Sequence, residues 1–472
     1  MSIEDIRRLR LDWFGLPNQS TSFADALNRA FDEIGFSDAY VDQRIKGGAD
    51  RPRRTKVVKD NVWGMIELDE SAIRLLDCPI LQRLRRIRQL GFSYLTYPSA
   101  EHSRFVHSLG MFGVISRFIQ SATRDGLVDK IGEANQDYKA HSISFSDRLD
   151  LQHAALLHDS GHLPFSHASE VAVQSLPALA CVGTLPIDEF FGLADKAGVR
   201  HPKLAELLSI AIVLSPRFQR FYSNYVRPST ENQTTLANAA LRVASLIMGK
   251  PPDNRMIAYS DLISGRVIDA DKLDYVSRDG MACGIPTGID VDRLFLRSAF
   301  LLFTKDELNR LRRRSGYQPV DSDQVHFIVN SSGRDTIEEL IAARTSLYHR
   351  VYFHQTTRNA ERIYEQLIER TLSSLHAEGR PQDVLQIWVK SDEEMLFGLG
   401  RVADPLAREL AMRVASRQLP KRSVVFGHGE LTPLMSFRQA FQRGQIQFED
   451  GPLRLQQLQR YSKETLNKVQ TL

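Results

Sequence analysis

Apolar side chains recur at helical spacing through most of this chain, and this periodicity constrains the fold more than any other feature. It predicts helices over residues 71–90, 107–121, 147–158, 203–214, 235–248, 268–278 and 335–376. Strand patterns are few and short, and they cover residues 62–68, 385–389 and 422–426. A chain with this balance is expected to fold as a mostly α protein.

The length of 472 residues is too great for one small core, and about 150 residues per domain suggests roughly three units. Polar helical spacing over residues 1–45, followed by Gly47 and Gly48, predicts an N-terminal helical arm and linker over 1–55. We expect a helical core over residues 56–376 and a small mixed α+β C-terminal lobe over residues 377–472.

Composition excludes several classes of protein. No stretch approaches the roughly 18 consecutive apolar residues of a membrane helix, and Met1 to Ser20 lacks an apolar signal core. The three cysteines, Cys78, Cys181 and Cys283, are too few and too far apart for a disulfide framework. We therefore expect a cytoplasmic protein without membrane association.

Net charge is small, at +4 from 61 basic and 57 acidic residues. A protein dedicated to nucleic acid would carry a larger basic excess, so nucleic-acid binding is expected to be secondary. Basic clusters at residues 51–59, 83–88 and 310–314 suit polyphosphate ligands as well as a solvated surface.

The segment HAALLHDSGHLPFSH, residues 153–167, is the most informative for chemistry. Apolar residues at helical spacing before His158 predict that its side chain leaves the buried face of a helix. Asp159 follows directly, and the pair Ser160-Gly161 ends the helix. An imidazole beside a carboxylate binds ions such as Fe, Mn or Zn, so the pair predicts part of a metal site.

Two further segments supply matching donors. His107 heads an apolar stripe of its predicted helix, where a histidine packed in the core is the alternative interpretation. In the segment VIDADKLDYVSRD, Asp271, Tyr275 and Asp279 recur at every fourth position, beside Lys272. That helix face combines two carboxylates with a phenol and an ammonium group, so it suits a ligand wall better than a solvated surface.

These positions form the pattern H…HD…D, whose members are His107, His158, Asp159 and Asp271. The chain thereby resembles the HD-domain metal phosphohydrolases, and among them the deoxynucleoside triphosphate (dNTP) triphosphohydrolases. Five segments match that family in order: DCPILQRLRRIRQLG (77–91), SRFVHSLG (103–110), HDSGHLPFSH (158–167), DADKLDYVSRD (269–279) and RTSLYHRVY (344–352).

The resemblance implies a helical HD-domain core whose four motif residues hold a divalent transition metal, Fe, Mn or Zn. It implies Mg²⁺ bound with the triphosphate. The reaction implied is hydrolysis of a dNTP at the α-phosphorus to a deoxynucleoside and inorganic triphosphate, in dNTP pool control or phage defence.

The resemblance also implies roles for histidines near the reacting phosphate. His167 matches the proton donor to the departing 5′ oxygen, and His162 matches a residue that supports the phosphates and the nucleophile. Histidine suits such proton transfer near neutral pH. The family has one more active-site histidine, usually followed by Glu. The matching position is His201, which is followed here by Pro202.

Basic and phenolic side chains are the expected partners of the triphosphate. Arg104, Lys272 and Arg344 are the natural phosphate clamps, because guanidinium and ammonium groups both bind phosphate oxygens. By resemblance, Tyr275 and Arg344 contact the phosphates.

The resemblance further implies a deoxyribose site. Gln89 and Asp279 match positions that hydrogen-bond the 3′ hydroxyl, and Leu90 and Tyr352 match positions whose bulk excludes a 2′ hydroxyl. Tyr348 recurs with Tyr352 at helical spacing and completes a basic-aromatic face that also includes residue 344.

Asp77, Gln82 and Arg85 match positions that form a guanine-nucleotide regulatory pocket between subunits in some relatives. The match implies activation by GTP or a dNTP and assembly into a homo-oligomer, from a dimer to a tetramer or larger. A plain packing role for these residues is the alternative interpretation.

Two other functions share the metal motif. One is an HD-domain phosphodiesterase or nuclease that acts on cyclic nucleotides or single-stranded nucleic acid, and the other is a catalytically inactive nucleotide sensor. The helix faces at residues 271–279 and 344–352 favour a mononucleoside triphosphate over the first. Retention of all four motif residues and of both loop histidines argues against the second.

Overall fold

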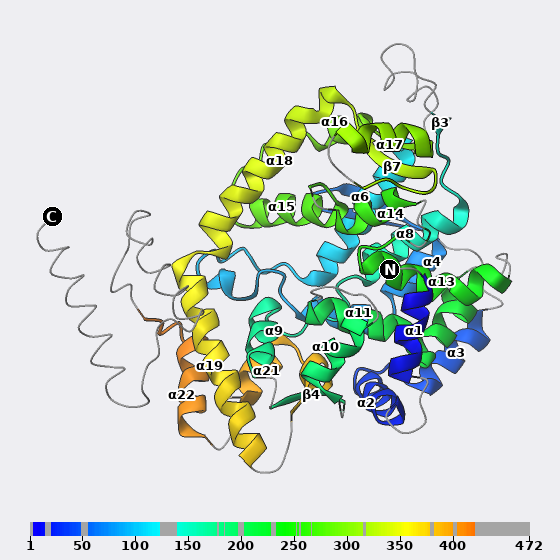
Figure 1. Ribbon diagram of the computed structural model, residues 1–472. Helices are drawn as coiled ribbons and strands as arrows, with labels where there is room; N and C mark the ends of the chain where they lie inside the picture. Colours follow the sequence, from blue (N-terminus) through cyan, green and yellow to red (C-terminus); the bar gives the residue numbers. More distant parts are fainter. Residues whose placement is uncertain are drawn as a thin grey trace, which may run out of the picture. The chain divides into compact units, whose positions relative to one another are not determined.

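The computed structural model describes residues 3–14, 20–48, 55–122, 139–176, 179–183, 185–196, 203–227, 233–251, 253, 256–265, 267–314, 318–377, 382–399 and 404–420. Contacts along the chain gather Met1–Leu419 into one compact unit and Pro420–Leu472 into a second. Helices dominate the described residues, so the expectation of a mostly α fold is confirmed (Figure 1).

The helices of the first half are α1 (Ile3–Phe14), α2 (Ser20–Glu33), α3 (Asp38–Gly48), α4 (Glu70–Leu76), α5 (Pro79–Arg83), η1 (Leu84–Arg86), η2 (Gly91–Leu95), α6 (Arg104–Ala122), α8 (Phe145–Leu157), α9 (His167–Gln174), α10 (Ile187–Lys196), α11 (Leu204–Leu214), α12 (Pro216–Phe221) and η3 (Tyr222–Val226). Those of the second half are α13 (Gln233–Ile247), α14 (Ile257–Ser264), α15 (Ala270–Ala282), α16 (Val291–Leu296), α17 (Lys305–Arg314), η4 (Ser331–Gly333), α18 (Arg334–Leu347), η5 (Tyr348–Tyr352), α19 (Gln355–Ala377), α20 (Val384–Trp388), α21 (Asp392–Leu399) and α22 (Pro405–Ala415).

Strands are short and form three small sheets among the described residues. β1 (Lys56–Asp60) and β2 (Gly64–Leu68) make an antiparallel hairpin, which confirms the extended segment expected near residues 62–68. β6 (Ser298–Phe303) pairs antiparallel with β3 (Lys139–Ala140) and β7 (Gln324–Val329). β4 (Ala180–Val182) pairs antiparallel with β5 (Leu185–Pro186) and parallel with β8 (Gln382–Asp383).

Helix α6 packs against both α8 and α15, and these three helices position the candidate site. Gly110 permits the close approach of α6 to α15. A Cβ atom at this position would lie 1.9 Å from Oδ1 of Asp274 and 2.1 Å from Nη2 of Arg278. The missing side chain therefore lets His107, one helical turn before Gly110, lie beside α15.

One continuous cluster of buried apolar side chains extends from Ile6 in α1 to Val414 in α22. Trp13 and Trp388 are both fully buried in it. The N-terminal helices and α20–α22 therefore share the core of residues 56–376, and the compact units divide at residue 420 rather than near residues 56 and 377.

Two local predictions were wrong. Residues 385–389, expected as a strand, lie in and just after helix α20, because a short and mostly apolar segment does not distinguish a strand from a short buried helix. The helix expected over 335–376 is interrupted by a π-helical turn at Tyr348–Tyr352 and begins again at Gln355. The strand expected over residues 422–426 lies outside the described residues.

None of the described helices is both long and apolar enough to cross a lipid bilayer.

Candidate functional site

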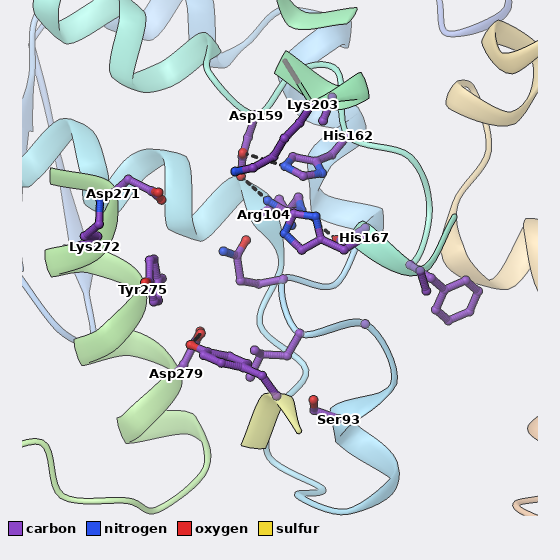
Figure 2. A pocket seen from close by; sticks show the side chains of 18 of the residues that line it. Ser93, Arg104, Asp159, His162, His167, Lys203, Asp271, Lys272, Tyr275 and Asp279 are labelled. Carbon is purple, nitrogen blue, oxygen red and sulfur yellow. Dashed lines mark hydrogen bonds and ion pairs between the residues drawn. The ribbon is translucent and has the colours of Figure 1, made fainter. Parts of the chain in front are cut away.

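A cavity of about 450 Å³ is lined by residues of α6, α9, α15, the η5 turn and the chain after α8. Figure 2 shows Asp271, Tyr275 and Asp279 in a row along α15, on one wall of this cavity. Asp159 and His162 lie opposite the Asp271 end, and Ser93 lies near the Asp279 end. The cavity thus extends from a cluster of histidines and carboxylates to a polar and aromatic region around Asp279.

The turn after α8 positions His158 and Asp159. His158 ends the helix, and Oγ of Ser209 on α11 donates a hydrogen bond of 2.7 Å to its carbonyl oxygen. The same hydroxyl accepts a 2.8 Å hydrogen bond from the amide of Gly161. A Cβ atom at Gly161 would lie 2.2 Å from the carbonyl oxygen of Ala205, so this tight turn requires glycine.

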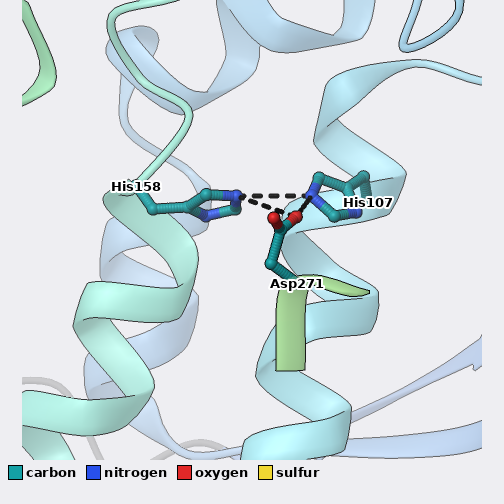
Figure 3. A group of neighbouring side chains, drawn as sticks. All are labelled: His107, His158 and Asp271. Carbon is teal, nitrogen blue, oxygen red and sulfur yellow. Dashed lines mark hydrogen bonds and ion pairs between the residues drawn. The ribbon is translucent and has the colours of Figure 1, made fainter. Parts of the chain in front are cut away.

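Side chains from three separate chain segments converge at the metal end of the cavity (Figure 3). Nε2 of His107 lies 3.3 Å from Nε2 of His158 and 3.0 Å from Oδ1 of Asp271. Nε2 of His158 lies 4.0 Å from the same carboxylate oxygen. The three ligand atoms therefore face one shared point, as a metal site requires.

The hydrogen bonds behind the two histidines fit a bound metal. Nδ1 of His107 lies 2.7 Å from Oδ2 of Asp274, and Nδ1 of His158 lies 2.8 Å from the carbonyl oxygen of Ala155. With each Nδ1 donating to an oxygen, Nε2 of each ring is left to face the cavity as a ligand. Imidazole and carboxylate donors suit Fe, Mn or Zn, so these residues fit the cation that the motif implies.

Asp159 joins this centre and is held anionic. Its Oδ1 lies 3.2 Å from Nε2 of His158, and its Oδ2 lies 3.8 Å from Nε2 of His107. Oδ2 accepts a 2.5 Å hydrogen bond from Nη1 of Arg104. Burial disfavours the ionised carboxyl, but Arg104, His158 and His162 outweigh burial and hold the pKa of Asp159 well below its ordinary value.

His162 and His167 flank Glu170 on the far side of Asp159. Nε2 of His162 lies 3.1 Å from Oδ1 of Asp159, while its Nδ1 lies 2.6 Å from Oε1 of Glu170. Burial and Arg104 lower the pKa of His162, but the two carboxylates outweigh them and raise it. Nδ1 of His167 lies 3.4 Å from Oε2 of Glu170, and this side chain is 62% exposed, so it is open to a ligand.

His162, His167 and Glu170 also form a second group whose potential ligand atoms lie within 4.8 Å of one another. Because His162 lies between two carboxylates, this group suits a network that holds and moves a proton.

Two helices supply the walls beyond the metal end. Nε of Arg344 on α18 donates a 2.9 Å hydrogen bond to Oη of Tyr275 on α15, and its guanidinium lies 4.9 Å from the ring centre of Tyr348. Oη of Tyr352 donates a 2.5 Å hydrogen bond to Oδ2 of Asp279. The π-helical turn at Tyr348–Tyr352 thus brings both tyrosines to the cavity, and such turns are frequent at functional sites.

Gln89 and Leu90 also line the cavity. Oε1 of Gln89 is buried without a hydrogen-bond partner among the described residues, so it is available to a ligand donor. Lys272 lines the cavity as well, but its ammonium group is bound to Oδ2 of Asp269 at 2.5 Å and to the carbonyl oxygen of Gly265 at 2.7 Å.

Three predicted site residues lie away from the cavity, and a fourth lies outside the described residues. His201 lies outside the described residues. Asp77, Gln82 and Arg85 do not line the cavity. Oε1 of Gln82 accepts a 2.9 Å hydrogen bond from Nε of Arg85, and Asp77 lies 3.6 Å from Nζ of Lys56.

Sequence reasoning missed three residues of the site: Lys203, Glu170 and Asp274. Lys203 lines the cavity, and Figure 2 shows its side chain directed toward Asp159 and His162. Helical spacing offered a signal for the other two, since Glu170 is three residues after His167 and Asp274 is three residues after Asp271. No local pattern marked Lys203.

Comparisons with known proteins agree with this geometry. The family model of the HD associated region matches residues 319–447. The uncharacterized protein YwfO of Bacillus subtilis is 28% identical over 386 residues, which cover 77% of this chain and 71% of YwfO. The deoxynucleoside triphosphate triphosphohydrolase SAMHD1 of Xenopus laevis is 40% identical over 252 residues.

The SAMHD1 match covers 52% of this chain but only 37% of the frog protein. A phosphohydrolase of Bacteroides thetaiotaomicron, known as a crystal structure, matches with a TM-score of 0.53 at 22% identity, over 83% of this chain and 84% of that one. At this level of identity, the similarity between the two structures concerns the fold alone. By its motif residues and by these relatives, the chain is similar to the HD-domain, deoxynucleoside triphosphate triphosphohydrolase-like proteins.

Proposed function

We propose that this chain hydrolyses deoxynucleoside triphosphates to a deoxynucleoside and inorganic triphosphate. The observation that supports this most directly is one cavity that joins the histidine–carboxylate centre to the Asp279–Tyr352 contact. His107, His158, Asp159 and Asp271 would hold a divalent metal. When bound, such a metal polarises a phosphoryl oxygen and favours ionisation of water.

Cationic side chains of the cavity wall would bind the triphosphate. Arg344 lies next to Tyr275 on the open side of the cavity, where it can donate to phosphate oxygens. Lys203 adds a second cation. Partial desolvation of its amine opposes the charge, but Glu206, Asp271 and Glu170 raise the pKa of that amine, so it stays protonated. Both groups offset the charge that a triphosphate brings near Asp159 and Asp271.

The leaving group needs a proton. Hydrolysis at the α-phosphorus breaks the bond to O5′, and that oxygen must be protonated as it departs. His167 is exposed to the cavity and its Nδ1 faces Glu170, which leaves Nε2 to donate to O5′. His162, held between Asp159 and Glu170, would keep this loop in place and support the attacking water.

The opposite end of the cavity suits a deoxyribose. Carboxylate oxygens of Asp279 and the unpartnered Oε1 of Gln89 can both accept from a 3′ hydroxyl. Leu90 and Tyr352 line the same region, and their bulk would exclude a 2′ hydroxyl. The proposed preference for deoxyribose therefore depends on steric exclusion of a hydroxyl group at C2′ of the sugar.

A regulatory nucleotide site at Asp77, Gln82 and Arg85 is a second part of the proposal. Asp77 and Arg85 are exposed. Nζ of Lys56 lies 3.6 Å from Asp77, so its ammonium group could bind a phosphate of a nucleotide held at this site. A non-hydrolysable GTP analogue should raise the sedimentation coefficient and the rate of dNTP hydrolysis, and Gln82→Ala with Arg85→Ala should abolish both effects. An unchanged sedimentation coefficient and rate would remove regulation while leaving the hydrolase proposal intact.

The deciding experiment is product analysis after incubation of each dNTP and NTP with purified protein and Mn²⁺, Mg²⁺ or Fe²⁺. A deoxynucleoside with intact inorganic triphosphate, absent with His158→Ala/Asp159→Ala, is the expected result. Asp306→Asn, on the exposed surface of α17, is the matched control and should behave as wild type. No turnover of any nucleotide, alone or mixed with GTP and dGTP, would overturn the proposal, and cleavage of cyclic nucleotides or single strands would replace it.

A further inference from the structure

Asp392, the first residue of α21, has a fully buried carboxylate that bonds to two separate backbone segments of the site. Its Oδ1 accepts a 2.7 Å hydrogen bond from the amide of Phe165. Its Oδ2 accepts a 3.0 Å hydrogen bond from the amide of Arg88. A buried charged acceptor with two backbone donors makes strong and directional contacts, so it can hold both segments in position.

The first segment is the histidine loop, which we define as residues His162–His167. Phe165 and Ser166 have φ angles of 53° and 52°, a left-handed conformation that side chains with a Cβ atom disfavour. Two such residues in succession persist only where the surroundings hold them. The Phe165 amide bonded to Asp392 lies within this strained pair, directly between the two catalytic histidines.

The second segment precedes Gln89. The carbonyl oxygen of Arg88 accepts a 3.0 Å hydrogen bond from Oγ of Ser166, and that hydroxyl accepts a 2.8 Å hydrogen bond from Nε of Arg104. The histidine loop and the Gln89 segment are therefore linked to each other, and Asp392, which does not line the cavity, bonds to the backbone of both. One carboxylate thus sets the separation between the proposed proton donor and the proposed sugar contact.

Trp388 in α20 adds a contact at the start of the same loop. Its Nε1 donates a 2.8 Å hydrogen bond to the carbonyl oxygen of Ser160. Arg83 donates to the carbonyl oxygens of Trp388 at 2.6 Å, Ser160 at 3.0 Å and His162 at 2.7 Å. The backbone from Ser160 to Phe165 is thereby bound to a chain segment more than two hundred positions away.

We propose that Asp392 is a positioning residue for catalysis, and that the segment Val384–Leu399 completes the active site by holding the histidine loop. Asp392 does not line the substrate cavity. It bonds the backbone amides of Phe165 and Arg88, and Nη1 of Arg88 also lies 3.4 Å from its Oδ2. This inference rests on the proposed function for its catalytic consequence, while the contact itself can be tested without turnover.

The test is Asp392→Asn, because an amide has one acceptor oxygen and cannot accept from both backbone amides. We expect kcat to fall roughly 10- to 100-fold, as for a small misplacement of catalytic groups, with a much smaller change in KM. Hydrogen exchange measured by mass spectrometry should become faster in residues 162–167 and near residue 88, and stay unchanged in α13. Glu393→Gln is the matched control, since its exposed carboxylate lies 2.8 Å from the side chain of Arg88 rather than on a backbone amide of the site, and this variant should not alter kcat.

Wild-type kcat and wild-type exchange in Asp392→Asn would overturn the positioning role. If the wild-type protein itself shows no turnover, the proposed function fails, and the exchange measurement still decides whether Asp392 holds the loop. Should Asp392→Asn fail to fold, Trp388→Phe keeps an aromatic ring in the core and removes the donor to Ser160. It should lower kcat in the same direction, and an unchanged kcat would count against the proposal.

Discussion

Lys203 sits at the mouth of the cavity with a side chain that is 65% exposed and 3.3 Å from Oε1 of Glu206. Its ammonium group can therefore turn to a ligand with little rearrangement, and the proposed triphosphate is the ligand it suits. Lys203→Met should raise KM for a dNTP roughly tenfold with a smaller effect on kcat, because the lost cation binds phosphate in the ground state as well as in the transition state.

Inhibition by inorganic tripolyphosphate should weaken in parallel with KM, and Lys203→Arg should restore most of the affinity. Steady-state kinetics on the three proteins measures both effects, with the exposed Lys305→Met as control. A fall in kcat at constant KM would show instead that Lys203 acts only on the transition state.

His153 is a second residue with a measurable consequence, and it concerns stability. The side chain is fully buried, with Nδ1 2.8 Å from Oη of Tyr222 and Nε2 3.0 Å from Oγ of Ser71. Burial, and secondarily Arg227, hold the pKa of His153 well below its ordinary value of 6.5. The folded state therefore keeps this ring neutral at pH values at which the unfolded chain protonates it.

The stability contributed by neutral His153 is present above the unfolded pKa of about 6.5 and is lost as pH falls toward the folded value. Where the unfolded chain binds one proton more than the folded protein, the free energy of unfolding falls by about 1.4 kcal/mol for each pH unit of acidification. Urea unfolding between pH 7 and pH 5 should show a shallower loss of unfolding free energy for His153→Gln than for wild type. Equal slopes would mean that the buried ring is protonated in the folded protein.

At the scale of elements, the contact of α6 with α15 depends on Gly110. Gly110→Ala would place a methyl group against Asp274 and Arg278, two buried side chains that form an ion pair at 2.8 Å. We expect a loss of about 3 kcal/mol of unfolding free energy or more. Metal binding should weaken as well, because separation of the helices moves His107 away from Asp271.

The matched substitution is Gly192→Ala in α10, where a Cβ atom would meet nothing within 4 Å. This variant should be unchanged or slightly more stable, since alanine favours a helix over glycine. Thermal unfolding of the two variants beside wild type measures the contrast, and similar melting temperatures for both would contradict the packing argument.

Most helices were predictable from the sequence because their apolar stripes are long enough for the period to be clear. α8 and α11 begin within two residues of the predicted starts. α20 was not predictable, because its five residues contain four buried apolar side chains and present no polar face. The interruption of the helix at Tyr348–Tyr352 could not be predicted either, since no Gly or Pro occurs there.

Much of the candidate site could be proposed from spacing and family resemblance. Residues 107, 158, 159 and 271 were named from the motif, and the structure brings their side chains together. Lys203 and Asp392 could not be named, because each reaches the site only through tertiary folding and neither belongs to a local motif. A buried carboxylate such as Asp392 looks in the sequence like any acidic helix start.

At the scale of the whole molecule, a bound metal would link three helical segments that are far apart in the sequence. Any ligand that binds only the folded state stabilises it, by about 2.7 kcal/mol at a concentration one hundred times its dissociation constant. Tm of metal-stripped protein should therefore rise with the logarithm of added Mn²⁺ or Fe²⁺. Asp271→Asn should remove most of this rise, whereas the surface control Asp306→Asn should keep it.

Differential scanning calorimetry across a metal titration measures the effect without any substrate. A Tm that is independent of metal in the wild-type protein would mean that the four motif residues hold no cation under those conditions.

The hydrogen bond between Phe165 and Asp392 joins positions that are 227 residues apart. At about 5–20 residues added per second, a ribosome needs roughly 10–45 s to extend the chain from one position to the other. A nascent chain that has already emerged through the histidine loop lacks its anchoring carboxylate throughout this interval. The histidine loop is thus expected to reach its final conformation only after residue 392 has been synthesised and has left the exit tunnel.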